Sequence, residues 1–272
     1  MTIILITAIF ALLLAFILGL ALGFFREFFA VEQDPLIGQI REALPGANCG
    51  ACGFPGCDGY ASALASATAD ASGRIEINRC SVGGQPVADK LAALTGNISS
   101  SVVPIISVLA CRGAKDKAPL KGEYSGIPTC RGAKLSTGGT KLCAWGCLGF
   151  GDCVKVCAFG AISMGEDGLP KIDKSLCTGC KRCVAECPQL VLQVVPRGRT
   201  GAIPLCSNRN PIKANVLKTC KAGCIKCELC VKNCPENCIT LEKGIPVIDY
   251  TKCTSCGTCA AKCPTKVLSV LG

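Results

Sequence analysis

The sequence predicts an α+β protein with one N-terminal transmembrane helix, a small helical cysteine-rich domain, and two copies of a small α+β module. Three observations carry this prediction. The chain starts with a long run of residues without a charge, a glycine- and cysteine-rich segment precedes an alanine-rich stretch, and the second half contains an internal duplication. Because the 272 residues include 31 glycines and only 5% aromatics, small domains held together by something besides apolar packing are expected.

Cysteine and histidine content narrows the chemistry. The chain has 25 cysteines and no histidine. The absence of histidine excludes Ser-His and Cys-His catalysis and any histidine-ligated zinc or haem site. A disulfide scaffold, cysteine-only zinc and iron–sulfur clusters remain. No Walker or dinucleotide-binding motif occurs, and no catalytic site for hydride chemistry is expected in this chain.

Residues 1–26 are predicted to anchor the chain in the cell membrane by a single pass. The uncharged run from Thr2 to Phe25 would extend about 35 Å as a helix, enough to cross a hydrocarbon core of about 30 Å. A signal peptide is the alternative, but nothing basic precedes the run except the amino terminus. Arg26 and Arg41 follow it, which places the soluble domains on the cytoplasmic side.

Residues 27–97 are predicted to form a small helical domain with its own ligand set. Helices are expected over 61–71 and 85–95, and a strand over 98–110 opens a strand-and-linker segment, 98–125. Three thiols on a glycine-rich loop and one distant thiol suit a [4Fe–4S] cubane, with zinc as the alternative. This set comprises Cys49, Cys52, Cys57 and Cys80.

The rest of the chain contains two repeats, 126–200 and 201–272. The segment 126–130 (GIPTC) matches 202–206 (AIPLC) 76 residues later, and 169–173 (LPKID) matches 245–249 (IPVID). Four cysteines also recur 77 residues later: Cys143, Cys147, Cys153 and Cys157 correspond to Cys220, Cys224, Cys230 and Cys234.

Three stretches carry the spacing C-x2-C-x2-C-x3-C-P. They are Cys177/Cys180/Cys183/Cys187, Cys224/Cys227/Cys230/Cys234 and Cys253/Cys256/Cys259/Cys263. In this pattern three thiolates on one loop meet three irons of a cubane, and the fourth leaves toward a neighbouring cluster. Zinc prefers two separate C-x2-C pairs, so the spacing predicts iron–sulfur clusters.

These motifs resemble those of bacterial two-cluster ferredoxins, in which the fourth cysteine of each motif ligates the other cluster. The resemblance implies three ligand sets. They are Cys224/Cys227/Cys230/Cys263, Cys253/Cys256/Cys259/Cys234 and Cys177/Cys180/Cys183/Cys157.

The remaining motif departs from the pattern, because Phe150 stands where the second repeat has Cys227. Cys143, four residues before Cys147, could supply the missing thiolate, and the expected set is Cys143, Cys147, Cys153 and Cys187. Five cysteines are then left over: Cys111, Cys130, Cys206, Cys220 and Cys238. They are interpreted as buried structural thiols, with a further metal site built from four of them as the alternative.

The order of anchor, small cysteine domain and ferredoxin repeats resembles the B-subunit family of Rnf ion-translocating ferredoxin:NAD oxidoreductase complexes. The resemblance rests on Leu44-Pro45, the segment 49–57 (CGACGFPGC) and the segment 77–80 (INRC) followed by Gly83-Gly84. The small domain alone also occurs in corrinoid iron–sulfur proteins.

The resemblance implies an electron-transfer subunit with about five [4Fe–4S] clusters, one unit of a translocase. It would relay electrons from soluble ferredoxin to flavin- and NADH-binding subunits and so couple NAD reduction to Na⁺ or H⁺ movement. A polyferredoxin subunit of another membrane redox enzyme, such as a hydrogenase or dehydrogenase, is the alternative. A zinc or metal-storage scaffold is a third hypothesis.

Net charge is consistent with cluster binding. Five oxidised cubanes with four thiolates each would carry about −10 in total, which offsets the formal charge of +10. The case for a nucleic-acid partner therefore largely disappears, and no nucleic acid is expected. Some exposed lysines are expected to guide an acidic redox partner.

Overall fold

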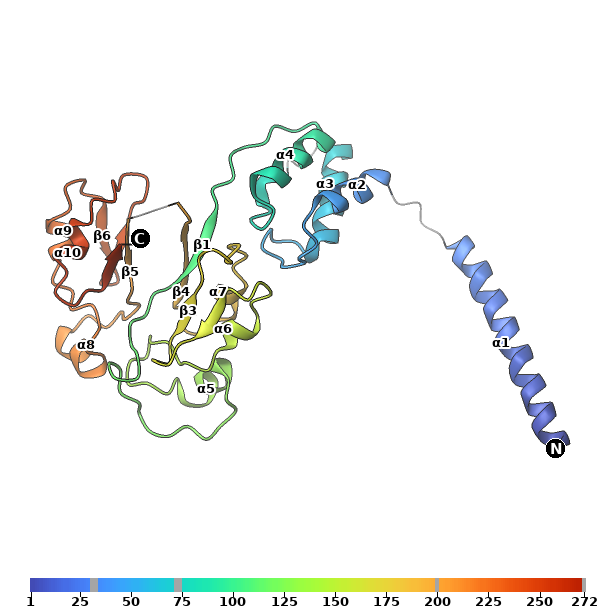
Figure 1. The fold of residues 1–272 in the computed structure, drawn as a ribbon, viewed down its shortest axis with the longest axis horizontal. Helices are drawn as coiled ribbons and strands as arrows, with labels where there is room; N and C mark the ends of the chain where they lie inside the picture. The colour runs from blue at the N-terminus through green and yellow to red at the C-terminus, as the bar shows by residue number, and fades with distance from the viewer. Residues whose placement is uncertain (30–33, 71–74, 199–200, 271–272) are drawn as a thin grey trace.

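The computed structural model describes residues 1–29, 34–70, 75–198 and 201–270. The first helix, α1 (Thr2–Phe28), stands apart from the remaining elements (Figure 1). The most apolar 18-residue window of its stretch Thr2–Arg26 has a mean hydropathy of 3.1, and none of that window is buried against the rest of the chain. A helix of this length with an exposed apolar surface suits a membrane anchor.

The small helical domain contains α2 (Pro35–Ala43), α3 (Gly56–Asp70), the 3-10 turn η1 (Ile77–Arg79) and α4 (Gly84–Thr95). Its core is made by Ile40, Tyr60, Leu64 and Leu91, each at most 1% exposed. Helix α3 begins five residues before the expected start, because the Asn48 side chain accepts the N–H of Cys57 at 2.8 Å in its first turn. Position 71, the expected end, lies outside the described residues.

The first module contains two antiparallel strand pairs and three short helices. Its elements are β1 (Ile105–Leu109), α5 (Cys130–Thr137), α6 (Asp152–Lys155), β2 (Ile162–Met164), β3 (Pro170–Ile172), α7 (Arg182–Glu186) and β4 (Leu192–Pro196). Strand β1 pairs with β4, and β2 pairs with β3. Strand β1 is shorter than the expected 98–110 because it begins after Pro104, and the preceding chain bonds to α4 instead: the Val102 N–H donates to Gln85 Oε1 at 2.8 Å.

The second module has the same arrangement. Its elements are β5 (Ala202–Pro204), α8 (Lys213–Thr219), α9 (Leu229–Lys232), β6 (Ile239–Glu242), β7 (Ile245–Ile248), α10 (Thr258–Ala261) and β8 (Leu268–Val270). Strand β5 pairs with β8, and β6 pairs with β7, all antiparallel. The second module, drawn in orange to red, lies beside the strand pair β1–β4 of the first (Figure 1).

The strand pairing shows which segments of the two modules correspond. Leu109 pairs with Leu192, and Pro204 pairs with Leu268, 76 residues after Leu192. Strand β1 is therefore the counterpart of β5. The segment 126–130, which resembles 202–206 in sequence, instead leads into α5 and contributes no strand. Consequently Cys111 and Cys206 both lie two residues beyond matching strands.

Candidate iron–sulfur sites

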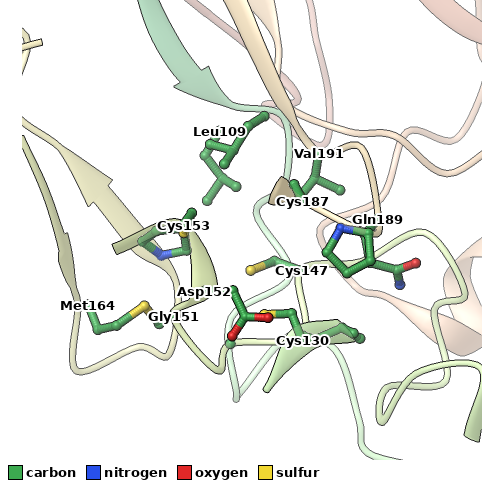
Figure 2. A pocket seen from close by; sticks show the side chains of 15 residues that line it. Leu109, Cys130, Cys147, Gly151, Asp152, Cys153, Met164, Cys187, Gln189 and Val191 are labelled. Carbon is green, nitrogen blue, oxygen red and sulfur yellow. The ribbon is translucent and has the colours of Figure 1, made fainter. Parts of the chain in front are cut away.

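A cavity of about 390 Å³ in the first module is lined by four thiols and by apolar side chains such as Leu109 and Val191. The four are Cys130, Cys147, Cys153 and Cys187. Figure 2 shows them around this pocket, with Asp152 beside Cys130. Four thiols around an apolar hollow are the donor set that a cubane requires.

The structure departs here from the expected ligand set, because Cys130 and not Cys143 joins the other three cysteines. Cys130 opens α5, and the backbone groups of Phe150 and Asp152 hydrogen-bond to its thiol. The ring of Phe150 packs edge-on against Tyr124, with centroids 5.5 Å apart. Helix α5 therefore supplies the thiol that Phe150 cannot. Cys143 lines a different cavity.

Two further cavities hold the ligand sets expected from the ferredoxin pattern. One, of about 330 Å³, is lined by Cys157, Cys177, Cys180 and Cys183. The other, of about 360 Å³, is lined by Cys224, Cys227, Cys230 and Cys263. In both cavities the fourth cysteine comes from the partner motif of the same module, as the crossed pattern requires.

Three thiols of each of the last two expected sets lie in or against an apolar cluster. Cys234, Cys253 and Cys259 pack in the core of the second module, whereas Cys256 is exposed. In the small domain, Cys52, Cys57 and Cys80 pack against its core, and Cys49 is near enough to Cys80 to act on it electrostatically.

Cys238 is buried beside one of these sets, with its Sγ 3.4 Å from the Sγ of Cys234. A buried thiol among apolar neighbours fills space as a small hydrophobe.

Burial raises the pKa of three thiols that line the first cavity, those of Cys130, Cys147 and Cys153. The pKa values of Cys147 and Cys153 both rise to about 12, through loss of hydration and then through neighbouring cysteines. Without iron these thiols are protonated at neutral pH, so iron must displace their protons when a cluster binds.

Backbone N–H groups point at several of the sulfurs. The N–H of Ser107 donates to Cys177 at 3.4 Å, that of Val267 donates to Cys263 at 3.3 Å, and that of Gly83 donates to Cys80 at 3.4 Å. Such donors favour the anionic thiolate over the neutral thiol. The cysteines and the N–H donors around them therefore suit the binding of iron–sulfur clusters.

Two sequence families match the cysteine-bearing regions. Residues 44–82 match the family described as a putative Fe-S cluster. Residues 142–191 and 223–267 match the 4Fe-4S dicluster domain. These matches confirm the predicted fold class and the prediction of several [4Fe–4S] clusters.

Relatives with curated names match nearly the whole chain. The B subunit of the Na(+)-translocating ferredoxin:NAD(+) oxidoreductase complex of Acetobacterium woodii is 39% identical over 93% of this chain and 74% of its own. The B subunit of the ion-translocating oxidoreductase complex of Methanosarcina acetivorans is 38% identical over 94% of each chain. The B subunit of the proton-translocating ferredoxin:NAD(+) oxidoreductase complex of Clostridium ljungdahlii is 41% identical over 95% of this chain and 89% of its own. The chain therefore belongs to the B-subunit family of Rnf-type ion-translocating oxidoreductase complexes, as an electron-transfer subunit with several [4Fe–4S] clusters.

Proposed function

We propose that this subunit accepts electrons from reduced soluble ferredoxin and relays them to flavin- and NADH-binding subunits of an Rnf-type complex. Those subunits reduce NAD and couple the transfer to movement of Na⁺ or H⁺. Helix α1 holds the chain in the cell membrane, and the cysteine-bearing domains face the cytoplasm. The names of the relatives and the exposed apolar surface of α1 support this assignment.

We assign five ligand sets. They are Cys49/Cys52/Cys57/Cys80, Cys130/Cys147/Cys153/Cys187, Cys157/Cys177/Cys180/Cys183, Cys224/Cys227/Cys230/Cys263 and Cys234/Cys253/Cys256/Cys259. The bound clusters supply one-electron transfer. The chain holds them in apolar surroundings and directs N–H groups at their thiolates.

The observation that carries the proposal is a contact between the ligand loops of the small domain and the first module. Ser81, which follows Cys80, donates through its hydroxyl to the carbonyl of Gly179 at 3.4 Å. Gly179 lies between Cys177 and Cys180, so the small domain and the first module touch at their ligand loops. Crossed ligation then joins the two sets within each module.

We assign the ferredoxin docking face from the exposure of the ligand cysteines. Cys227 and Cys256 are the two exposed cysteines, and both belong to the second module. Exposed lysines lie nearby in the sequence, among them Lys232 and Lys252. Ammonium groups beside an accessible ligand loop would attract an acidic electron carrier, so we assign the docking face to the second module.

Replacement of Cys224 tests the function. In a complex purified without oxygen, Cys224→Ala should abolish electron transfer from ferredoxin to NAD, and the variant should still co-purify with the flavin-bearing subunits. Cys238→Ala is the matched control and should retain activity. Full activity in Cys224→Ala, or a wild-type chain that never co-purifies with flavin-bearing subunits, would contradict the proposal.

A further inference from the structure

A separate cavity of about 320 Å³ is lined by four thiols from both modules. They are Cys111, Cys143, Cys206 and Cys220. None of them belongs to the five sets above. The cavity nearly equals in volume the one of about 330 Å³ around Cys177 and Cys180. Its remaining walls include Trp145, Leu205 and Asn208.

The internal repeat relates these thiols as two matching pairs. Cys111 and Cys206 follow the matching strands β1 and β5. Cys143 and Cys220 are the second pair of counterparts. Each lies four residues before a thiol of another set. Each module therefore contributes the same two positions, and the cavity lies where the modules meet.

Hydrogen bonds to the sulfurs repeat the same correspondence. The N–H of Cys147 donates to the Sγ of Cys111 at 3.3 Å, and the N–H of Cys224 donates to the Sγ of Cys206 at 3.4 Å. The N–H of Gly113 also donates to Cys111, at 3.4 Å.

The second pair of thiols has donors too. Burial raises the pKa of Cys143 and that of Cys220, and the backbone of Trp145 and that of Ala222, each two residues further on, oppose this rise. The amide of Asn208, only 2% exposed, reaches the Sγ of Cys143 at 3.6 Å. The N–H groups that donate to Cys111, Cys143 and Cys206 suit iron-bound thiolates better than thiols.

A buried cation accompanies these sulfurs. Lys141 is 4% exposed, and its Nζ donates to the carbonyl of Gly113 at 2.5 Å. Its charge acts on both Cys147 and Cys220. Within the described ranges no carboxylate forms an ion pair with Lys141. Because a buried ammonium needs a compensating anion, anionic ligation here would balance its charge.

We propose that Cys111, Cys143, Cys206 and Cys220 hold a sixth [4Fe–4S] cluster between the two modules. A single zinc ion fits less well, since zinc needs sulfurs within about 2.3 Å of one point. In the described part of the chain, no group of three or more Cys, Asp or Glu side chains converges closely enough for a single ion. The four thiols surround a hollow of cubane-site size instead.

This site, made by Cys111, Cys143, Cys206 and Cys220 and called the bridging site below, joins the two ferredoxin-like modules. Cys143 and Cys147 are ligands of adjacent sets, as are Cys220 and Cys224, and an N–H of each neighbouring set donates to a sulfur of the bridging site. The bridging site therefore shortens the route between the modules. Its existence does not depend on the donor and acceptor proposed above, because it is tested by metal content.

Iron and sulfide content of the full chain, purified or reconstituted without oxygen, tests the inference. Six clusters predict about 24 iron and 24 sulfide per wild-type chain, and five predict about 20 of each. The double variant Cys206→Ser/Cys220→Ser leaves two thiols in the cavity and should contain about 4 fewer iron and sulfide. Low-temperature EPR of the reduced double variant should show fewer unpaired spins per chain than the wild type, in proportion to the cluster that is lost. Cys238→Ala, the control, should keep the wild-type content.

Three results would overturn the sixth cluster. They are about 20 iron per wild-type chain, an unchanged iron content in the double variant, or one zinc per wild-type chain that the double variant lacks. If the double variant fails to fold, the wild-type iron and zinc content decides the question. A wild-type complex that contains about 24 iron per chain but does not transfer electrons from ferredoxin to NAD would count against the proposed function. It would leave the cluster assignment intact.

Discussion

The two ferredoxin-like modules have the same strands, but they differ in how they complete their ligand sets. In the second module, Cys224, Cys227 and Cys230 follow one another on a loop that runs into α9. In the first module, Phe150 interrupts that loop, and Cys130 reaches the same cavity from α5. The segment that carries Cys130 is an insertion: 32 positions separate Cys111 from Cys143, whereas 14 separate their counterparts Cys206 and Cys220.

This difference shows that a cubane site depends on where thiols lie in space and tolerates a change in where they lie along the chain. The insertion replaces one ligand of the loop with a thiol at the start of a helix. The insertion makes the loop longer, and the entropic cost of ordering a loop on folding rises only slowly with its length. Cys143 is thereby left for the bridging site in the first module, as Cys220 is in the second.

The largest effect is expected from exchanging the two ways of completing a set. Cys130→Ala should remove or degrade the cluster of the first module, with a loss of up to about 4 iron per chain, because three thiols remain in the cavity. Cys130→Ala/Phe150→Cys restores the loop of the second module and should recover iron and EPR signal.

The matched control for this exchange is Cys143→Ala/Phe150→Cys. If Cys130 is the ligand, this control keeps the cluster of the first module but loses the bridging one. Wild-type iron content in Cys130→Ala would show that the first module does not use Cys130.

A backbone effect distinguishes the other ligand loop of each module, at Gly179 and Ser255, which are 76 residues apart and have φ of +69° and +63°. A Cβ at Gly179 would lie 2.4 Å from the carbonyl oxygen of Ile105, so β1 leaves no room for a side chain. Gly179→Ser should therefore lower the free energy of unfolding by about 2 kcal/mol or more. Ser255→Gly should change it by less than about 1 kcal/mol.

Thermal unfolding of the cluster-loaded chain measures both changes. Because Gly179 also accepts the Ser81 hydroxyl, the Gly179 variant should in addition loosen the small domain from the first module, with faster proteolysis between them. Equal stability of the two variants would mean that β1 can move away from the ligand loop.

A smaller, electrostatic effect is expected at another matched pair, Lys141 and Lys218, each two residues before a cysteine of the bridging site. Lys141 is buried, whereas Lys218 is exposed. A nearby cation stabilises the reduced cluster, so Lys141→Met should shift one or two midpoint potentials to more negative values, on the order of 30 to 60 mV. Lys218→Met should shift them by much less because water screens its charge. Redox titration followed by EPR compares the variants. Equal shifts in midpoint potential would show that the Lys141 charge acts on the clusters no more strongly than the exposed Lys218 charge does.

Much of the architecture could be predicted from the sequence, because the information was local. The uncharged run at residues 2–25 and the spacing of Cys49, Cys52 and Cys57 need no knowledge of tertiary structure. The crossed sets with Cys157 and Cys263 were expected from resemblance, and the structure gathers them in two cavities.

The bridging set could not be chosen in the same way, because it depends on strand pairing between distant segments. The likeness of 126–130 to 202–206 suggests that Cys130 and Cys206 are counterparts. The pairing of β1 with β4 and of β5 with β8 makes Cys111 the counterpart of Cys206 instead. Phe150 signals that a ligand is missing, but spacing alone favours the near Cys143 over the distant Cys130.

The smallest effect is expected where the two halves of the bridging site differ in one side chain. Trp145 and Ala222 are counterparts, and both line the cavity of Cys111 and Cys206. The indole covers one side of the hollow, so Trp145→Ala should leave the iron content unchanged but admit water and chelator to the cluster there. We expect a several-fold faster loss of about 4 iron to a ferrous chelator, with the remaining iron lost at the wild-type rate. Leu135→Ala, an exposed apolar residue away from this cavity, is the control. A uniform acceleration of all iron loss in Trp145→Ala would indicate general destabilisation, and an unchanged profile would show that the indole does not shield the site.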